Sequence, residues 1–288
     1  MNAVFKHELG SYFTGLTAYV FGFFLLLFAG IYTMVYCLRS GIANFELVLG
    51  SMAFVFIVIV PILTMRVLAE ERRQKTDILL YSLPISTTKI VLGKFFAMLV
   101  ILLIPVAVIG LYPLILRAFG AVYLPAAYAA VFGFLCVGAA MLAIGMFISS
   151  LTESQAVAAG ICFVVMLINF FGSSLASYVS ASPMSSVVAF SVIVVLIALL
   201  TRFMTKSDFT ATIVGCLLEI GLIAVYMVNS SLFSGLFGSI MAKLSIFDRF
   251  YTIVNGVLKL TDVVYFLTVI AIFLFLSVQS FEKRRWSE

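Results

Sequence analysis

The sequence has little charge for its length. Only 10% of its 288 residues are Asp, Glu, Lys or Arg, against about a quarter in ordinary soluble domains. It also has a single His and six Pro, whereas 64% of its residues are hydrophobic. A soluble protein of this length has no means of burying so much apolar surface, but a bilayer solvates it. The predicted fold class is therefore all-α, as a polytopic membrane protein, because a β-barrel would show short alternating segments.

The motifs of common enzyme classes are absent from the sequence. It lacks a Gly-x-x-x-x-Gly-Lys-Ser/Thr loop for nucleotide phosphates, since the pair Gly93-Lys94 is followed by Phe95. Neither His-Glu-x-x-His nor Gly-x-Ser-x-Gly occurs. The four Cys are scattered, without a Cys-x-x-Cys pair, and we interpret them as packing residues. We expect no enzyme activity, cofactor or metal in this chain; an intramembrane protease or lipid synthase is the alternative of a different class.

Apolar runs long enough to cross a bilayer define the predicted topology. A helix rises about 1.5 Å per residue, so about twenty residues cross a hydrocarbon core of about 30 Å. By this criterion the sequence predicts about eight spans: Thr17–Leu38, Gly50–Ala69, Ile90–Leu116, Tyr123–Ser150, Ser154–Tyr178, Ser185–Met204, Phe209–Asn229 and Val263–Ser280.

Lysine and arginine are distributed unevenly between the two sides of this topology. Twelve fall on one side and five on the other, and the richer side is predicted to be cytoplasmic. An even number of spans then places both termini in the cytoplasm, with the chain in the inner (plasma) membrane. The net charge of +5 reflects this bias, and no basic stripe with interleaved aromatic residues indicates nucleic-acid binding. The cytoplasmic group is Lys6, Arg66, Arg72, Arg73, Lys75, Lys89, Lys94, Arg202, Lys206, Lys283, Arg284 and Arg285, and the outer group is Arg39, Arg117, Lys243, Arg249 and Lys259.

Two segments outside the spans have apolar patterns of their own. In residues 1–16 apolar side chains recur at helical spacing. This predicts an amphipathic helix in the inner membrane interface, or else an extension of the first span. Residues 230–261 are too apolar for a solvated loop and too interrupted to span. They predict one or two interfacial or re-entrant helices on the outer side, which must pack against protein or lie at the membrane surface.

A dense cluster of charge between the second and third spans is the most informative segment. Its ionic side chains must lie outside the hydrocarbon, and Thr76–Pro84 has the pattern of a short helix with a capping Thr and a terminating Pro. The spacings Arg66–Glu70 and Glu71–Lys75 alone indicate only an exposed helix end, stabilised by about 0.2–0.5 kcal/mol per pair. The adjacent apolar-faced helix favours docking of a cytosolic partner. The residues predicted to bind that partner are Glu70, Glu71, Arg72, Thr76, Leu79, Leu80, Leu83 and Pro84.

Two polar residues are predicted within the spans. Glu219 lies near the middle of the seventh span, where a charge costs roughly 2.5–3.5 kcal/mol on insertion scales. It either lines a substrate path or relays a proton, or it hydrogen-bonds to a neighbouring helix through backbone or Ser/Thr groups. The second interpretation is slightly favoured. Asn169 in the fifth span poses the same question.

Several short motifs occur in a fixed order along nearly the whole chain. In that order they resemble the permease subunit of ABC exporters of the type-2 class, and most closely its gliding-motility-like branch. The sequence departs from this pattern at Lys75, where the family usually has Gly, and at Ile78, where Glu is usual. The motifs are Pro61-Ile62-Leu63-Thr64-Met65-Arg66, Ala69-Glu70-Glu71, Thr76, Leu79-Leu80, Pro84-Ile85-Ser86, Gly93-Lys94, Gly145, Ser149-Ser150-Leu151-Thr152, Gln155, Leu244-Ser245, Phe247, Phe250, Gly256-Val257, Asp262-Val263-Val264-Tyr265 and Glu282-Lys283-Arg284-Arg285-Trp286.

The resemblance implies a fold and a set of partners. Two permease chains, the same or similar, would face each other across a substrate path. Each would dock a separate subunit that binds ATP and Mg and hydrolyses the ATP. In this single transmembrane domain of residues 1–288, residues 1–16 would be the elbow helix, 72–88 the coupling loop and 230–261 the paired re-entrant segment. The family core generally has six spans, so 185–229 would be an additional helix pair.

The predicted function is therefore that of the transmembrane subunit of an ABC exporter. Its substrate is unidentified, and the 29 Phe permit an amphipathic molecule without indicating one. Two alternatives stay open. A non-transporting membrane subunit would pass ATPase motion to an envelope partner. A secondary transporter would ordinarily show ion-binding residues at broken helices in two repeated halves, and the sequence shows no such repeat.

Overall fold

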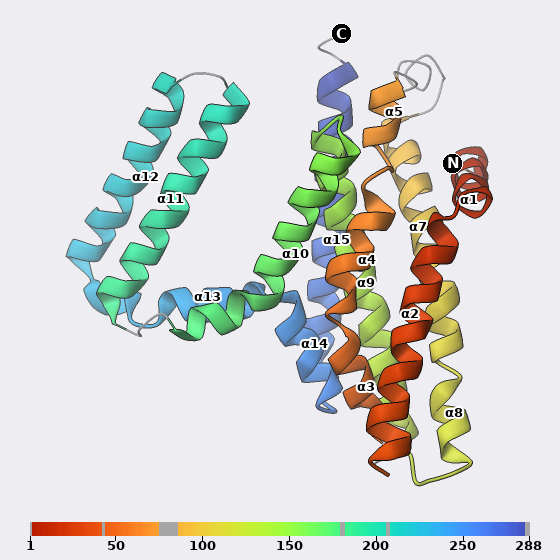
Figure 1. Cartoon of the computed structure of the whole chain (residues 1–288). Helices are drawn as coiled ribbons and strands as arrows, with labels where there is room; N and C mark the ends of the chain where they lie inside the picture. Colours follow the sequence, from red (N-terminus) through yellow and green to blue (C-terminus); the bar gives the residue numbers. More distant parts are fainter. Residues whose placement is uncertain (1, 42–43, 75–85, 179–181, 206–207, 286–288) are drawn as a thin grey trace. The chain divides into compact units, whose positions relative to one another are not determined.

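The computed structural model describes residues 2–41, 44–74, 86–178, 182–205 and 208–285 (Figure 1). All regular structure in these ranges is helical, which confirms the predicted all-α class. The helices are α1 (Asn2–Thr14), α2 (Thr17–Thr33), the π-helix η1 (Met34–Arg39), α3 (Phe45–Met52), α4 (Val55–Thr64), α5 (Ala69–Gln74), α7 (Thr87–Ile109), α8 (Tyr112–Arg117), α9 (Leu124–Leu151), α10 (Gln155–Tyr178), α11 (Pro183–Thr205), α12 (Asp208–Val228), the 3₁₀-helix η2 (Ser230–Phe233), α13 (Leu236–Leu244), α14 (Ile246–Val254) and α15 (Leu260–Arg285).

The chain divides into two compact units. Unit 1 consists of Met1–Phe170 and Arg249–Glu288, and unit 2 consists of Phe171–Asp248. Unit 1 contains α1 to α9 and α15, whereas α11, α12, η2 and α13 belong to unit 2. The helix pair at 185–229 therefore falls in a different compact unit from the spans that precede and follow it in the sequence.

Five single helices of the described chain are long and apolar enough to cross a membrane. A sixth candidate is the bent pair of α3 and the segment Val55–Glu71. The other two predicted spans correspond to α11 and α12, whose described apolar stretches, Pro183–Val195 and Gly215–Val228, are shorter than a span. The chain is thus a polytopic α-helical membrane protein, and the count of eight spans stays a prediction. The five are Thr17–Arg39, Thr87–Arg117, Leu124–Leu151, Gln155–Gly172 and Leu260–Lys283.

Helix α9 is the central helix of unit 1. It packs against α15, α7, α4 and α3, and most of its apolar length is buried, whereas only a minor part of the apolar length of α2 and α15 is buried. Membrane helices approach one another closely where small residues line the contact. The buried surface of α9 has this composition, with Ala127, Ala130, Gly133, Gly138, Ala139, Ala140, Ala143 and Gly145.

Two glycines of α9 mark the closest of these approaches. A Cβ added at Gly145 would lie 2.8 Å from the Cβ of Thr64 in α4 and would overlap its hydroxyl. A Cβ added at Gly138 would lie 2.7 Å from the side chain of Leu102 in α7. A larger residue at Gly145 requires α4 to move away, so this glycine sets the spacing of α9 and α4, whereas a larger residue at Gly138 requires the ends of the Leu102 and Phe56 side chains to rearrange.

The second predicted span, Gly50–Ala69, is not one continuous helix. Its first part is bent by 56° between α3 and α4, and a further interruption at Met65–Leu68 precedes α5. At the bend the Ala53 N–H donates to the Gly50 carbonyl, three residues back, in a tightened turn. Gly50 is also closely packed, because a Cβ there would lie 3.1 Å from Val254 of α14. The run of apolar residues correctly indicated helix but did not reveal its two interruptions.

Unit 2 contains a hairpin in which α11 and α12 pack along each other (Figure 1). Most of the described side chains of α12 are exposed, and those of α11 are mostly exposed or half-buried. Near one end, Phe190 of α11 makes edge-to-face contacts with Phe233 of η2 and Phe237 of α13, at centroid distances of 6.4 and 5.7 Å. Aromatic packing thus joins the short helices of this unit to its hairpin.

The segment predicted as interfacial or re-entrant, residues 230–261, forms the short helices η2, α13 and α14. Helix α14 has an apolar face on which Phe250 and Ile253 are fully buried. Both side chains contact α9 at Gly133, where an added Cβ would lie 3.2 to 3.3 Å from them. In addition, Arg249 donates to Asp262 of α15 at 2.9 Å. The part of α14 in unit 1 therefore packs against protein, as irregular backbone at membrane depth requires.

Candidate functional site: the polar junction

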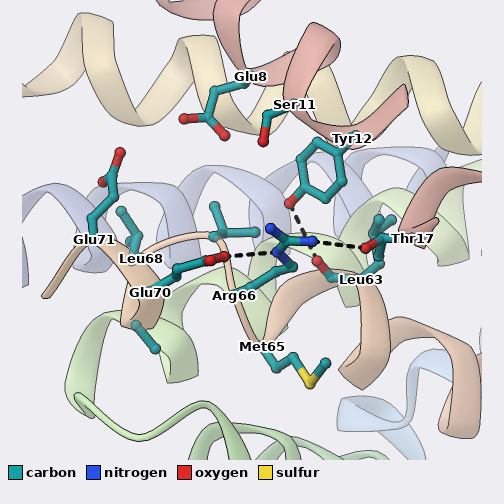
Figure 2. A network of polar contacts seen from close by, with 12 residues as sticks. Glu8, Ser11, Tyr12, Thr17, Leu63, Met65, Arg66, Leu68, Glu70 and Glu71 are labelled. Carbon is teal, nitrogen blue, oxygen red and sulfur yellow. Dashed lines mark hydrogen bonds and ion pairs between the residues drawn. The ribbon is translucent and has the colours of Figure 1, made fainter. Parts of the chain in front are cut away.

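The segments on either side of residues 75–85 meet other helices of unit 1 in a cluster of polar side chains. We call this cluster the polar junction, and Figure 2 shows the part around Arg66 and Tyr12. It joins α1, the start of α2, the interrupted end of the second span and the start of α7. Its members are Glu8, Tyr12, Thr17, Arg66, Glu70, Glu71 and Lys94.

Lys94 is the buried cation of the polar junction. It lies in the second turn of α7, and 1% of its side chain is exposed. Its ammonium group donates to Glu8 of α1 at 2.5 Å, to Glu71 of α5 at 2.7 Å and to the backbone carbonyl of Val67 at 3.2 Å. All three N–H donors of the ammonium group are therefore used. A buried charge is tolerated when it is paired and hydrogen-bonded in this way. Lys94 thus holds α1, α5 and α7 together.

Arg66 holds the corner between α1 and α2. Its Nε donates to Glu70 Oε2 at 2.8 Å, and its Nη1 donates to the Thr17 hydroxyl at 3.0 Å (Figure 2). Gly15, just before α2, lies beside the guanidinium, and a Cβ there would be in ordinary van der Waals contact with Nη1 at 3.5 Å. The Arg66–Glu70 spacing in the sequence indicated an exposed helix end. Instead the pair is largely buried, with 29% of each side chain exposed, and it reaches a second helix.

Tyr12 ties α1 to the end of α4. Its hydroxyl donates to the Leu63 carbonyl at 3.2 Å (Figure 2). In a regular helix this carbonyl would accept from Val67 N–H, which donates to Thr64 O instead. Burial, with the carboxylate of Glu8 nearby, raises the pKa of Tyr12 well above its usual value. The hydroxyl therefore keeps its proton and remains a donor to the carbonyl that the interruption releases.

Ser149 of α9 satisfies the other backbone groups at this interruption. Its hydroxyl accepts from the N–H groups of Leu68 and Ala69 at 3.2 and 3.1 Å, and donates to the Met65 carbonyl at 3.3 Å. Backbone groups cannot be left unpaired in an apolar environment without a cost of several kcal/mol each. A single buried hydroxyl therefore stabilises the break between α4 and α5.

The chain on the C-terminal side of residues 75–85 is also bound to another helix. Thr87, the first residue of α7, donates from its hydroxyl to Glu282 of α15 at 2.6 Å. The same end of α15 contacts α9, because the Ser280 hydroxyl donates to the Ser150 carbonyl at 3.1 Å. The carboxylate of Glu282 also lies at the N-terminal turn of α7, where the helix dipole favours negative charge. Both flanks of the loop are thus tied to helices of unit 1.

The residues predicted to bind a partner are only partly described. Glu70 and Glu71 belong to the polar junction, where each binds a cation of this chain. Arg72 lies in α5, and its side chain is outside the described residues, as are Thr76, Leu79, Leu80, Leu83 and Pro84. The two carboxylates therefore hold α5 in place, and docking through these eight residues stays a prediction.

Glu219 and Asn169 are not brought to the polar junction. Glu219 lies in α12 of unit 2, half-buried, and accepts a hydrogen bond from the Ser191 hydroxyl of α11 at 2.5 Å. It also lines a cavity of about 700 Å³ between the two helices, together with the exposed ion pair of Arg202 and Asp208. The interhelical bond to a serine is the kind that the favoured interpretation of Glu219 requires. Asn169 is half-buried in α10, and the roles of both residues stay predictions.

Sequence reasoning missed the central role of Lys94. It counted Lys94 as one more charge on the lysine-rich side and as part of a motif, and it assigned Glu8 to the polar face of an amphipathic helix. The available signal was a lone lysine at the start of a long apolar run, since such a charge needs a partner. Among the described residues no group of His, Cys, Asp and Glu is placed to hold a metal ion. The bonds of the polar junction hold α1, α2, α5 and α7 together.

Comparison with known proteins identifies the family. The family model described as ABC-2 family transporter protein matches residues 6–286, which is nearly the whole chain. A search of curated proteins finds no match. The first result confirms the resemblance noted in the sequence at the level of the family, while the gliding-motility-like branch stays a prediction.

Proposed function

Because the chain belongs to the ABC-2 family of transporter proteins, we propose that it is the transmembrane subunit of an ATP-driven exporter. A separate subunit binds ATP and Mg and docks on the coupling loop, residues 72–88. A second permease chain, the same or similar, completes the substrate path. The substrate is unidentified, and the apolar spans suit an amphipathic molecule. This chain itself performs no chemistry on the nucleotide.

One observation carries this proposal: on both sides of residues 75–85, at the two ends of the coupling loop, the chain is bound to helices of unit 1. On the N-terminal side Glu71 binds Lys94, and on the C-terminal side Thr87 binds Glu282. A force applied to the loop by a docked subunit therefore reaches α7 and α15 directly, and α1 through Lys94. A flexible tether would not transmit such a force. The bonds at both ends of the loop are what a loop needs in order to pass the movement of a docked subunit to the helices.

The proposed orientation has both termini in the cytoplasm of a cell whose inner membrane holds the chain. It rests on the excess of Lys and Arg on one side of the predicted topology. Cysteine labelling at positions 243 and 283 should then be possible from opposite sides of the membrane only. Labelling of both from the same side would contradict the eight-span topology.

We further propose that the substrate path runs between the first, second and fifth spans of two facing chains. Exposed apolar faces on these spans support this, including Phe23 and Ile31 of α2 and Ile161 and Ile168 of α10. A dimer of ATPase subunits, open or closed on ATP, would dock differently on the two coupling loops. That difference in binding free energy would shift the population between inward and outward states.

The docking of an ATPase subunit on the coupling loop is the point to test. The full chain is purified in mild detergent and its co-purifying chains are identified. The double variant Leu79→Asp/Leu80→Asp places charges in a dry contact, so we expect normal membrane insertion and loss of the ATPase subunit. The matched control is Leu258→Asp/Leu260→Asp, which charges two exposed leucines outside the loop. ATPase binding retained in the first variant would refute docking through Leu79 and Leu80.

A further inference from the structure

We propose that Lys94 is the positioning residue through which movement of the coupling loop reaches helix α1, by way of its simultaneous bonds to Glu71 and Glu8. This inference rests on the proposed function, because it takes the loop as the place where an ATPase subunit acts. It assigns to α1 a part in the transport cycle, as a helix driven by the ATPase instead of a passive membrane anchor.

Two of the three bonds of Lys94, to Glu71 and to Glu8, form a series from the loop to α1. Helix α5, which carries Glu71, ends at Gln74, directly before residues 75–85. Glu71 binds Lys94 at 2.7 Å, and Lys94 binds Glu8 of α1 at 2.5 Å. The side chain of Glu8 is 14% exposed and that of Glu71 is 21% exposed, so water competes little with them for the ammonium group. Displacement of α5 therefore acts on α1 through a single buried cation.

A buried cation is a suitable link because separating it from either carboxylate is unfavourable. If α5 moved alone, Lys94 would stay buried with one fewer partner, and the low-dielectric surroundings would not replace that partner. Movement of α5, Lys94 and α1 as one group keeps all three bonds. Movement of α5, Lys94 and α1 together is therefore favoured over movement of α5 alone.

Helix α1 is held on one face at two points, which makes it able to respond as a rigid element. Glu8 and Tyr12 are four residues apart and so project from the same face of the helix. Glu8 reaches α7 through Lys94, and Tyr12 reaches the Leu63 carbonyl at the end of α4. Helix α1 therefore bridges the two segments that flank the coupling loop on its membrane side.

Hydrogen–deuterium exchange of α1 in the purified complex tests this link. The complex of the full chain with its co-purified ATPase subunit is measured without nucleotide and after trapping with ATP and vanadate. Glu8→Gln is the principal variant, since it uncharges the α1 end of the link and leaves Lys94 paired with Glu71. Lys94→Met removes the link, Lys94→Arg keeps its charge, and Lys89→Met is the control, as an exposed lysine on the same helix.

In the native chain we expect hydrogen–deuterium exchange in α1 to differ between the nucleotide-free and the trapped state. We expect Glu8→Gln and Lys94→Met to lose that difference. Lys89→Met should retain it, and Lys94→Arg should retain it at least in part. The ATPase subunit should stay bound in every case. A difference that persists in Glu8→Gln overturns the inference, because Lys94 would then only stabilise the fold. Absence of any nucleotide-dependent change in the native chain, with the ATPase bound, overturns the inference alone. Absence of a co-purifying ATPase overturns the proposed function as well.

Discussion

Lys94 in unit 1 and Glu219 in unit 2 are both charged residues within long apolar helices, and the two units accommodate them differently. The ammonium group of Lys94 uses all of its donors on two carboxylates and one carbonyl. Glu219 accepts one hydrogen bond from Ser191, and its other oxygen is buried without a partner among the described residues. Lys94 thus organises the side chains around it, whereas Glu219 joins two helices by a single bond.

The two units also differ in how closely their helices pack at the positions compared below. In unit 1, glycines of α9 bring α4 and α7 into contact with its backbone. In unit 2 the packing is close at Gly215 of α12, where an added Cβ would lie 3.0 Å from the Cβ of Ala198, but Gly221 of the same helix has open space where a Cβ would be placed. Unit 1 is thus a closely packed core in which the buried ammonium group of Lys94 is fully paired. The described faces of the α11–α12 hairpin are mostly exposed and suit lipid or another chain.

The largest expected effect comes from removing the Lys94 charge. Lys94→Met leaves the carboxylates of Glu8 and Glu71 close together without their cation, and breaking a buried pair costs about 3–5 kcal/mol. We expect a clearly lower thermal unfolding midpoint for the purified chain in detergent. The exposed Lys89→Met should stay within about 0.5 kcal/mol of the native chain. Partial recovery in Lys94→Met/Glu8→Gln/Glu71→Gln would show that the stranded charges are the cause, and an unchanged midpoint in Lys94→Met would contradict this account.

A smaller effect is expected from one added methyl group, and its sign should differ between Gly145 of unit 1 and Gly221 of unit 2. Gly145→Ala forces a Cβ against Thr64, and overpacking of a tight core costs typically about 1–3 kcal/mol. Gly221→Ala meets open space, and alanine in a helix is favoured over glycine by roughly 0.5–1 kcal/mol. Thermal unfolding of both variants measures the difference. Equal destabilisation by the two substitutions would show that these two positions do not differ in packing as described.

The smallest effect is expected at Glu219. Glu219→Gln keeps the shape and a hydrogen bond to Ser191 while it removes the charge, so stability and ATP turnover of the assembled complex should be nearly unchanged. Glu219→Ala also removes the bond, and interhelical hydrogen bonds in membranes average about 0.6 kcal/mol. Assembly in native amounts and ATP turnover are the measurements. Normal assembly with abolished transport in Glu219→Gln would make Glu219 a residue of the substrate path or a proton relay.

The sequence was sufficient for the helices and the family because both depend on local patterns. Long apolar runs predicted α2, α7, α9, α10 and α15, since a membrane helix needs only length and composition. The bend between α3 and α4 escaped prediction because apolar residues continue through it. What breaks the helix there is a change of hydrogen-bond pattern and the packing of Gly50 against α14.

The polar junction was harder to predict because its bonds join distant parts of the chain. Lys94 and Glu8 are 86 residues apart, and Arg66 and Thr17 are 49 apart. Helical periodicity places each residue on a face of its own helix but does not say which helix that face meets. The hydrogen bond between Glu219 and Ser191 was easier to anticipate, because an acid within an apolar span needs a nearby donor.

The position of the Lys94 partners along the chain has a consequence for biosynthesis. Glu8 and Glu71 both precede Lys94, the second by 23 residues. At a translation rate of about 5–20 residues per second, Glu71 leaves the ribosome roughly 1–5 s before Lys94. Both counter-charges are thus already made when the helix bearing Lys94 reaches the insertion machinery. The lysine can be neutralised as soon as α7 enters the bilayer, without waiting for α9 or α15 to be synthesised.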